Sequence, residues 1–189
     1  MQTAQASRRH FLGTSGMLSA AAVALLAARP ALAQGMAHDP AQDVKILNVA
    51  LGLEHQAIGA YQLGAESGLL QKPMLEIAVL FQSHHKGHRD ALAAAIAQLG
   101  GTPVAAMKPE DYARALDAQK LKSQKDVLVL ASRLELGATN AYLGVIPAFE
   151  DRELAHVAGR LAADEAMHFT ALNGALDRPL AARALSFGA

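Results

Sequence analysis

Three histidines stand within five positions of an otherwise apolar stretch, at His84, His85 and His88. A glutamate and a fourth histidine, Glu165 and His168, have the same three-residue separation as His85 and His88. On a helix this separation places two side chains on one face, and imidazole and carboxylate groups are ligands of transition-metal ions. Three interpretations are open at this point: a solvated basic patch, buried residues that hydrogen-bond one another, or metal ligands.

Two further glutamates, Glu54 and Glu135, are each followed by a tyrosine seven positions later, at Tyr61 and Tyr142. Seven positions are about two helical turns, so each tyrosine lies on the same helix face as its glutamate. The chain therefore has four segments in which ionisable side chains recur at helical spacing.

Each segment predicts a helix whose apolar stripe includes the ionisable residues. Stripe residues recur at alternating spacings of four and three, as on the core-facing side of a packed helix. The four stripes consist of Leu47, Leu51, Glu54, Ile58 and Tyr61; of Met74, Ala78, Phe81, His85, His88, Leu92 and Ala95; of Leu128, Ser132, Glu135, Thr139 and Tyr142; and of Leu154, Ala158, Leu161, Glu165, His168, Leu172 and Ala175. We therefore expect His85 and His88 to point into the core, and His84 to lie on the flank of its helix.

Six ionisable side chains would then meet halfway along an apolar core, namely Glu54, His85, His88, Glu135, Glu165 and His168. A buried carboxylate destabilises a fold unless it is paired or binds a metal ion. No Lys or Arg occupies any of the four stripes, so a bound cation is the expected counter-charge. The alternative is a metal-free cluster of hydrogen-bonded glutamate–histidinium pairs.

The two halves of the chain repeat each other. The first and third stripes are 81 positions apart and the second and fourth are 80 apart, ionisable positions included. Very short links join the first helix to the second and the third to the fourth, which makes each pair an antiparallel hairpin. About twenty residues, 101–122, join the hairpins, with a short helical turn expected over 109–119. The sequence thus predicts an all-α four-helix bundle with a long crossover, in which the second and third helices run parallel.

This arrangement resembles the ferritin-like superfamily, which includes bacterioferritins and rubrerythrins, over about residues 40–178. The superfamily pattern is one Glu on each of two helices and a Glu-x-x-His on each of the other two. Glu54 and Glu135 match the single glutamates, and Glu165 with His168 matches one Glu-x-x-His. The resemblance implies a site for two metal ions, iron first, with manganese or zinc as alternatives.

The same resemblance assigns further roles. It implies that Glu54 and Glu135 can bridge the two ions, and that Tyr61 and Tyr142 lie near the ions as electron donors or gates. Each tyrosine is equally compatible with a core aromatic whose hydroxyl is satisfied. His84 and His55 are expected on the flanks of their helices, with contact to a ligand as their functional option.

The second helix departs from the pattern, because His85-Lys86-Gly87-His88 stands where Glu-x-x-His is expected. Two divalent ions bring four positive charges. Three glutamates compensate three of them, which leaves about one positive charge uncompensated. Imidazole also suits iron, zinc and copper, whereas carboxylates favour iron and manganese. The identity of the metal, and a site for one ion rather than two, therefore stay open.

The N-terminus has the pattern of an export signal. Ser-Arg-Arg-His-Phe-Leu at residues 7–12 precedes an uncharged apolar run and the Ala31-Leu32-Ala33 motif. These features predict a signal peptide similar to the bacterial twin-arginine (Tat) signal, with an uncleaved membrane anchor as the alternative. We expect residues 1–33 to be removed and residues 34–189 to form one domain in the periplasm. The Tat translocase would be a partner during export.

Composition limits the remaining classes of function. The chain has 189 residues, 52% of them hydrophobic, and no Cys, which suits one domain without disulfides. Residues 34–189 contain 14 Lys and Arg and 17 Asp and Glu, so their net charge is slightly negative. They contain no run of basic residues. We therefore expect no nucleic-acid partner and no stable membrane span after cleavage.

Several functions are compatible with these features. The leading prediction is a periplasmic ferritin-like metal-binding protein, for which the resemblance implies oxidation with O₂ or peroxide, or protection against both. Whether the protein is an enzyme stays open. The alternatives are a metal-free envelope or stress interaction module and, ranked lower, an iron-storage protomer, since no residue pattern indicates cage contacts. Assembly into a homo-oligomer is also open.

Overall fold

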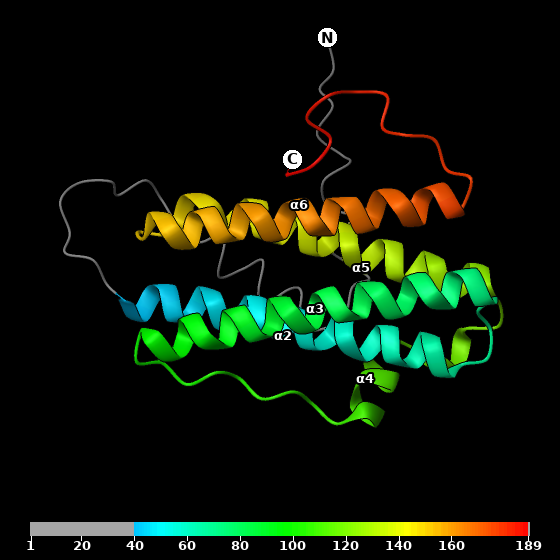
Figure 1. The fold of residues 1–189 in the computed structure, drawn as a ribbon, viewed down its shortest axis with the longest axis horizontal. Helices are drawn as coiled ribbons and strands as arrows, with labels where there is room; N and C mark the ends of the chain where they lie inside the picture. The colour runs from blue at the N-terminus through cyan, green and yellow to red at the C-terminus, as the bar shows by residue number, and fades with distance from the viewer. Residues whose placement is uncertain (1–39, 189) are drawn as a thin grey trace, which may run out of the picture.

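The computed structural model describes residues 40–188, and this part of the chain is helical without strands. Four long helices run side by side: α2 (Pro40–Glu66), α3 (Lys72–Gln98), α5 (Gln124–Val145) and α6 (Arg152–Ala175) (Figure 1). The shorter elements are α4 (Pro109–Ala115) and the 3₁₀ turns η2 (Ala118–Lys120) and η3 (Ile146–Ala148). The predicted all-α fold is confirmed.

Local sequence signals explain where these helices begin. The Ser123 hydroxyl accepts a hydrogen bond from the Asp126 N–H at the start of α5, as the capping pattern predicted. The Asp151 carboxylate accepts one from the Glu153 N–H at 2.7 Å and so caps α6. Pro73 lies in the first turn of α3, where its missing N–H leaves no hydrogen bond unmade.

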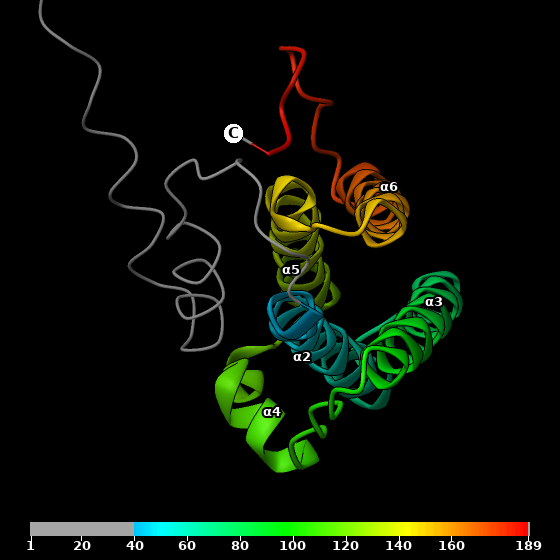
Figure 2. The ribbon, with the colours of Figure 1, turned by 90° about the vertical axis from the view of Figure 1, so that its left-hand side faces the viewer.

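The four long helices form two antiparallel hairpins, α2–α3 and α5–α6, each packed along its full length. The end-on view in Figure 2 shows the hairpins stacked as two layers, with α5 next to α2. Helices α3 and α5 run in the same direction (Figure 1). The predicted parallel arrangement of these two helices is therefore confirmed, and it follows from the length of the crossover between them.

The crossover is fastened to α2. Asn48 donates a hydrogen bond to the Thr102 carbonyl at 3.1 Å and accepts one from the Val104 N–H at 2.7 Å. The Tyr112 ring of α4 lies against Gly59, where a Cβ atom would come within 2.8 Å of a ring carbon. The glycine at 59 thus allows α4 to pack closely on the bundle.

The core has two apolar regions with a charged layer between them. One region occupies the end where α2 begins and contains Ile46, Leu47, Leu51, Leu92, Ile96, Tyr142 and Leu161. The other occupies the opposite end and contains Tyr61, Ala78, Phe81, Leu128, Ala131 and Leu172. The six predicted ligands lie between the two regions and are at most 8% exposed.

One helix end differs from the sequence prediction. Helix α5 ends at Val145 rather than near Phe149, because Pro147 cannot donate the backbone hydrogen bond that would continue the helix, and a 3₁₀ turn follows. The predicted signal peptide, residues 1–33, lies outside the described residues. No helix within residues 40–188 has the length and apolar character that crossing a membrane requires.

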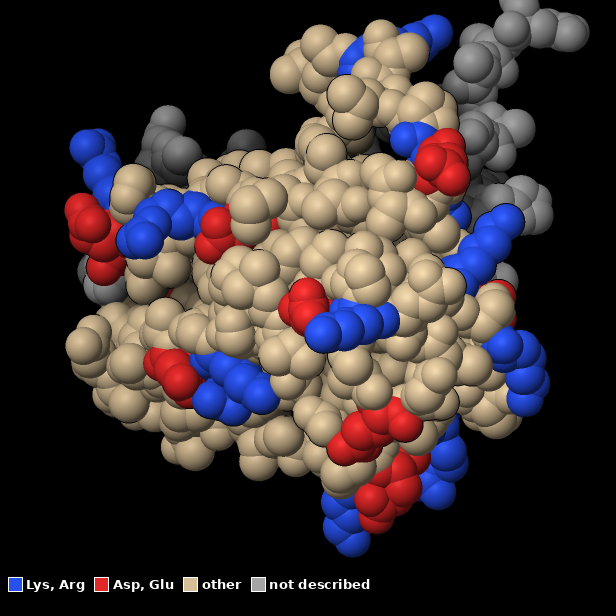
Figure 3. Space-filling model, turned by 45° about the vertical axis from the view of Figure 1, so that its right-hand side comes forward, with Lys and Arg blue, Asp and Glu red and all other residues tan. Residues whose placement is uncertain are grey.

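The surface of the bundle carries charges of both signs. On the face drawn in Figure 3, acidic and basic side chains lie interspersed, often as neighbours, and no broad basic area is visible. This distribution agrees with the near balance of Lys and Arg against Asp and Glu in the sequence. That face has no basic patch of the kind that binds nucleic-acid backbones.

Candidate metal centre

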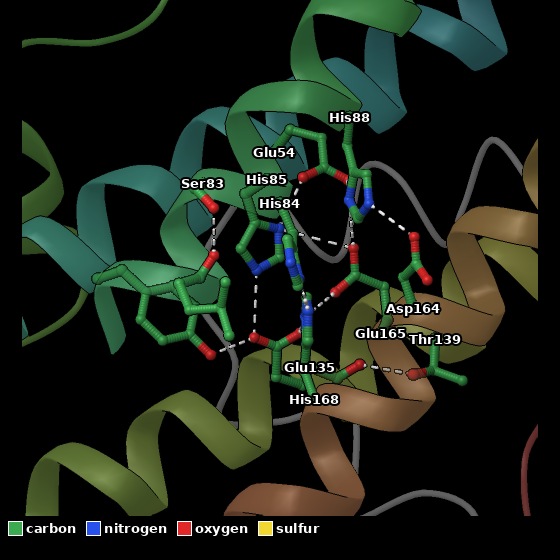
Figure 4. A network of polar contacts seen from close by, with 12 residues as sticks. Glu54, Ser83, His84, His85, His88, Glu135, Thr139, Asp164, Glu165 and His168 are labelled. Atoms are coloured by element: carbon green, nitrogen blue, oxygen red, sulfur yellow. Dashed lines mark hydrogen bonds and ion pairs between the residues drawn. The ribbon is translucent and has the colours of Figure 1, made fainter. Parts of the chain in front are cut away.

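Each long helix contributes to one buried cluster, which occupies the charged layer of the core (Figure 4). Glu54 comes from α2 and Glu135 from α5, while α3 and α6 each contribute two residues at a spacing of three. The cluster consists of Glu54, His85, His88, Glu135, Glu165 and His168. The structure thus brings together all six residues that the sequence predicted as ligands, and their role as ligands stays a prediction.

A first group of four donors lies on one side of the cluster. Glu54, His85, His88 and Glu165 each offer one ligand atom, and these atoms all lie within 4.8 Å of one another. His85 Nδ1 is 2.8 Å from Glu54 Oε2, and His88 Nδ1 is 3.0 Å from Glu165 Oε1. Two carboxylates and two imidazoles at this separation suit one transition-metal ion.

A second group of four donors adjoins the first. It contains His85, Glu135, Glu165 and His168, with ligand atoms again within 4.8 Å of one another. His85 Nε2 lies 3.2 Å from Glu135 Oε1, and His168 Nδ1 lies 3.2 Å from Glu165 Oε2. The donor types match those of the first group.

The two groups share His85 and Glu165. The single glutamates, which the family resemblance suggested as bridges, each belong to one group only: Glu54 to the first and Glu135 to the second. The residues placed to contact both donor groups are therefore His85 and Glu165, the first members of the two i, i+3 pairs. In one pair that member is a carboxylate, and in the other it is an imidazole.

Both tyrosines that the sequence singled out contact the cluster. The Tyr61 hydroxyl donates a hydrogen bond to Glu135 Oε1, and the Tyr142 hydroxyl donates one to Glu54 Oε1. Burial and the nearby carboxylates raise the pKa of both phenols well above the ordinary value. The tyrosines therefore stay protonated and fix the orientation of the two single glutamates.

Two residues outside the six hold the outer nitrogens of His88 and His168. His88 Nε2 donates to Asp164 Oδ2 at 3.1 Å, and the ring nitrogens His168 Nε2 and His84 Nδ1 are 2.9 Å apart. Such outer hydrogen bonds fix the tautomer and the orientation of a ligand ring. The sequence placed His84 on the flank with this contact as an option, and Asp164 could have been found as its counterpart in the repeat. His55, by contrast, contacts the Val104 carbonyl in the crossover.

The pKa values of the imidazoles show how strongly the cluster favours positive charge. Burial alone would lower the pKa of His85 and His88, but hydrogen bonds with the glutamates outweigh it. The pKa rises to about 11 for His85 and to about 10 for His88, and that of His168 is raised as well. For His84, burial and the neighbouring His168 lower the pKa. His84 is therefore a neutral acceptor for the ring proton of His168.

The carboxylates respond in the complementary way. Burial would raise the pKa of Glu54 and Glu135, but their hydrogen bonds with histidines lower it overall. Burial raises the pKa of Glu165, and its hydrogen bonds with His168 and His88 offset this only in part. The layer thus stabilises ionised Glu54 and Glu135, which must be neutralised by imidazolium groups or by a metal ion.

The donor set fits transition-metal ions. Glu135 Oε2 is buried and accepts no hydrogen bond, although His168 Nδ1 lies 3.4 Å away. Among the described residues, no Lys or Arg forms an ion pair or hydrogen bond with any of the six. Two adjoining groups of nitrogen and oxygen donors, with one carboxylate oxygen left over, are what divalent iron, manganese or zinc would use.

Comparisons with known proteins agree with the fold. The model of the ferritin-like domain family matches residues 42–178. The crystal structure of a conserved hypothetical protein from Mycobacterium tuberculosis is similar, with a TM-score of 0.60 and 22% sequence identity over 77% of this chain and 99% of that chain. At this identity the similarity concerns the fold alone. No sequence among the curated proteins matches the chain.

Proposed function

The chain belongs to the ferritin-like domain family, and we propose that it binds two transition-metal ions, most readily iron, in the buried layer of its bundle. The residues that would hold the ions are Glu54, His85, His88, Glu135, Glu165 and His168. The observation that carries the proposal is their arrangement in two adjoining four-donor groups from which Lys and Arg are missing within residues 40–188.

The activity proposed for this centre is oxidation with O₂ or peroxide as the acceptor, or protection of the cell envelope against both. Bound iron would supply one-electron redox chemistry and a binding position for the oxygen species. The protein's own residues exclude bulk water, since the ligands lie between two apolar regions. Tyr61 and Tyr142 hold the single glutamates in place and lie close enough to act as electron donors.

The periplasm is the compartment we propose for this protein. The support is the twin-arginine pattern at residues 7–12 and the Ala-x-Ala motif that ends at residue 33. Export of a folded bundle through the Tat translocase is consistent with a centre whose donors come from both hairpins. Such a centre exists only after the chain has folded.

A metal-free envelope or stress module is the second candidate. The observation in its favour is that His85, His88 and His168 already hydrogen-bond the three glutamates at 2.8–3.2 Å. Three imidazolium and three carboxylate groups neutralise one another without a metal ion. Metal content separates this candidate from the first.

The test is metal analysis of protein isolated from its native periplasm, followed by anaerobic titration of the metal-free protein with Fe²⁺. We expect about two ions per chain and oxidation of the bound iron on addition of peroxide. Glu135→Gln should lower the iron content, because the amide replaces an anionic ligand. Glu110→Gln, on the exposed side of α4, is the matched control and should bind as the natural protein does. Isolated protein without metal, with iron binding equal in both variants, would favour the metal-free module.

A further inference from the structure

The ring of His85 faces both donor groups at once. Its Nδ1 atom is 2.8 Å from Glu54 Oε2 in the first group, and its Nε2 atom is 3.2 Å from Glu135 Oε1 in the second. His88 and His168 each turn only Nδ1 toward the cluster and use Nε2 for an outer partner. His85 is thus the one imidazole among the six that offers no nitrogen to an outer partner.

The counterpart of His85 in the repeat has the same two-sided placement. Glu165 follows His85 by 80 positions, and its Oε1 faces His88 while its Oε2 faces His168. A carboxylate that faces both groups can bridge two ions. His85 occupies the equivalent position with two ring nitrogens instead of two oxygens.

The environment of the His85 ring keeps this orientation. The side chain is 1% exposed. Its ring centroid lies 5.4 Å from that of Tyr61, 5.7 Å from that of His88 and 5.3 Å from that of His168. A ring enclosed on several sides cannot turn one nitrogen out to solvent.

The charge of the cluster favours ligation at both nitrogens. Two divalent ions bring four positive charges, and the three glutamates supply three negative ones. An imidazole that binds an ion at each nitrogen has lost both ring protons and carries the fourth negative charge. The buried layer is then neutral, which matters because an uncompensated buried charge is strongly unfavourable.

On this basis, which presupposes the metal binding proposed above, we propose that His85 binds one ion at each ring nitrogen and so bridges two ions as an imidazolate. Metal–nitrogen bonds of about 2.0–2.1 Å on either side of the ring would place the ions about 6 Å apart. Two-metal sites bridged by small or carboxylate ligands hold their ions about 3.5–4 Å apart. His85 therefore makes this centre a widely spaced pair.

The spacing can be measured without an activity assay. The metal-free protein is loaded with Cu²⁺ alone to two equivalents and studied by X-ray absorption and electron paramagnetic resonance. We expect two copper ions per chain. X-ray absorption should show imidazole scattering at both ions and no copper–copper distance below about 4 Å. Electron paramagnetic resonance should show that the two copper spins are coupled through the His85 ring. The substitution His85→Glu places a carboxylate there and should shorten the separation to about 3.5–4 Å.

Two further variants separate bridging from other roles. His85→Ala should lose the spin coupling and bind fewer ions. His156→Ala removes an exposed histidine of α6 that belongs to neither donor group and should keep the separation and the coupling of the natural protein. Circular dichroism of all variants checks that the bundle is folded.

The outcomes distinguish this inference from the function on which it depends. Two ions less than about 4 Å apart in the natural protein, or unchanged coupling in His85→Ala, would overturn the imidazolate bridge and leave metal binding intact. Absence of bound ions from the natural protein would instead refute the proposed function.

Discussion

At the scale of single residues, groups of two kinds hold the carboxylates of the layer. Phenols donate to Glu135 and Glu54, and imidazoles donate to all three glutamates. A metal ion bound by these imidazoles would displace their ring protons, because a ligating nitrogen cannot keep its proton. The protonation of the histidines therefore reports whether the layer contains a metal.

A pH titration of the metal-free protein tests this coupling. The pKa of His85 is about 11 and that of His88 about 10 in the folded state, against about 6.5 for an unfolded histidine. Between these values the folded state binds more protons than the unfolded state, so the free energy of unfolding should fall as the pH rises. A decrease of about 1–3 kcal/mol per pH unit is expected between pH 7 and 9. Urea unfolding in the presence of a chelator measures it.

Two variants and the metal-loaded protein accompany the titration. His88→Gln should make the decrease smaller, whereas His156→Gln, at an exposed position of α6, should leave it unchanged. Protein loaded with metal should not show the decrease, since its rings no longer bind the protons in question. A metal-free protein whose stability stays constant over this pH range would show that the histidines are not protonated in the folded state.

At the scale of helices, two glycines on α2 differ in what surrounds them. A Cβ atom at Gly59 would lie 2.8 Å from a ring carbon of Tyr112, whereas one at Gly52 would meet nothing within 4 Å. Gly59 is therefore required for the packing of α4 on α2. Gly52 is free to take a side chain.

Alanine substitutions should separate the two glycines. Gly59→Ala should lower the free energy of unfolding by about 1–3 kcal/mol, because the methyl group overpacks the contact with α4. Gly52→Ala should raise it by about 0.5–1 kcal/mol, because alanine favours the helix. Denaturant unfolding of both variants at one pH provides the comparison. Equal stabilisation by both substitutions would mean that α4 does not pack on α2 in solution.

The arrangement of the helices could largely be predicted from the sequence. Apolar stripes defined the four helices, and the unequal lengths of the connections defined two hairpins with α3 and α5 parallel. The end of α5 was placed too late, because hydrophobic spacing continues past Pro147 although the backbone cannot. The packing of α4 on Gly59 could not be predicted, since a glycine within a helix does not indicate which element approaches it.

The six members of the buried cluster could be predicted, but the contacts among them could not. Helical spacing was enough to bring Glu54, His85 and the other four residues into one layer. Which nitrogen of His85 faces which glutamate depends on ring rotation and on the heights of the facing helices, and neither is recorded in residue spacing. For the same reason the structure was needed to show which outer nitrogen His84 and Asp164 each contact, although the repeat aligns these two residues.

At the scale of the whole molecule, the predicted twin-arginine signal can be tested by its two arginines. Replacement of Arg8 and Arg9 together by Lys should leave precursor that retains residues 1–33 in the cytoplasm, because the twin-arginine pair is the feature that a Tat signal requires. Arg29→Lys, in the same segment, should be exported as usual and begin at Gln34. Immunoblots of cell fractions and N-terminal sequencing distinguish the two. Periplasmic protein of mature length from the double variant would refute Tat export.

A homodimer of identical hairpins would be obliged by its two-fold axis to offer two identical halves of a site. Here both hairpins belong to one chain, and some counterpart positions of the repeat hold different residues. Position 84 is His where position 164 is Asp, and position 85 is His where position 165 is Glu. A residue in one hairpin can therefore change while its counterpart in the other hairpin stays the same. As a result His88 has a carboxylate as its outer partner and His168 a neutral imidazole. The single chain thereby gives its centre a polarity, a first position and a second, which a symmetric pair of hairpins cannot have.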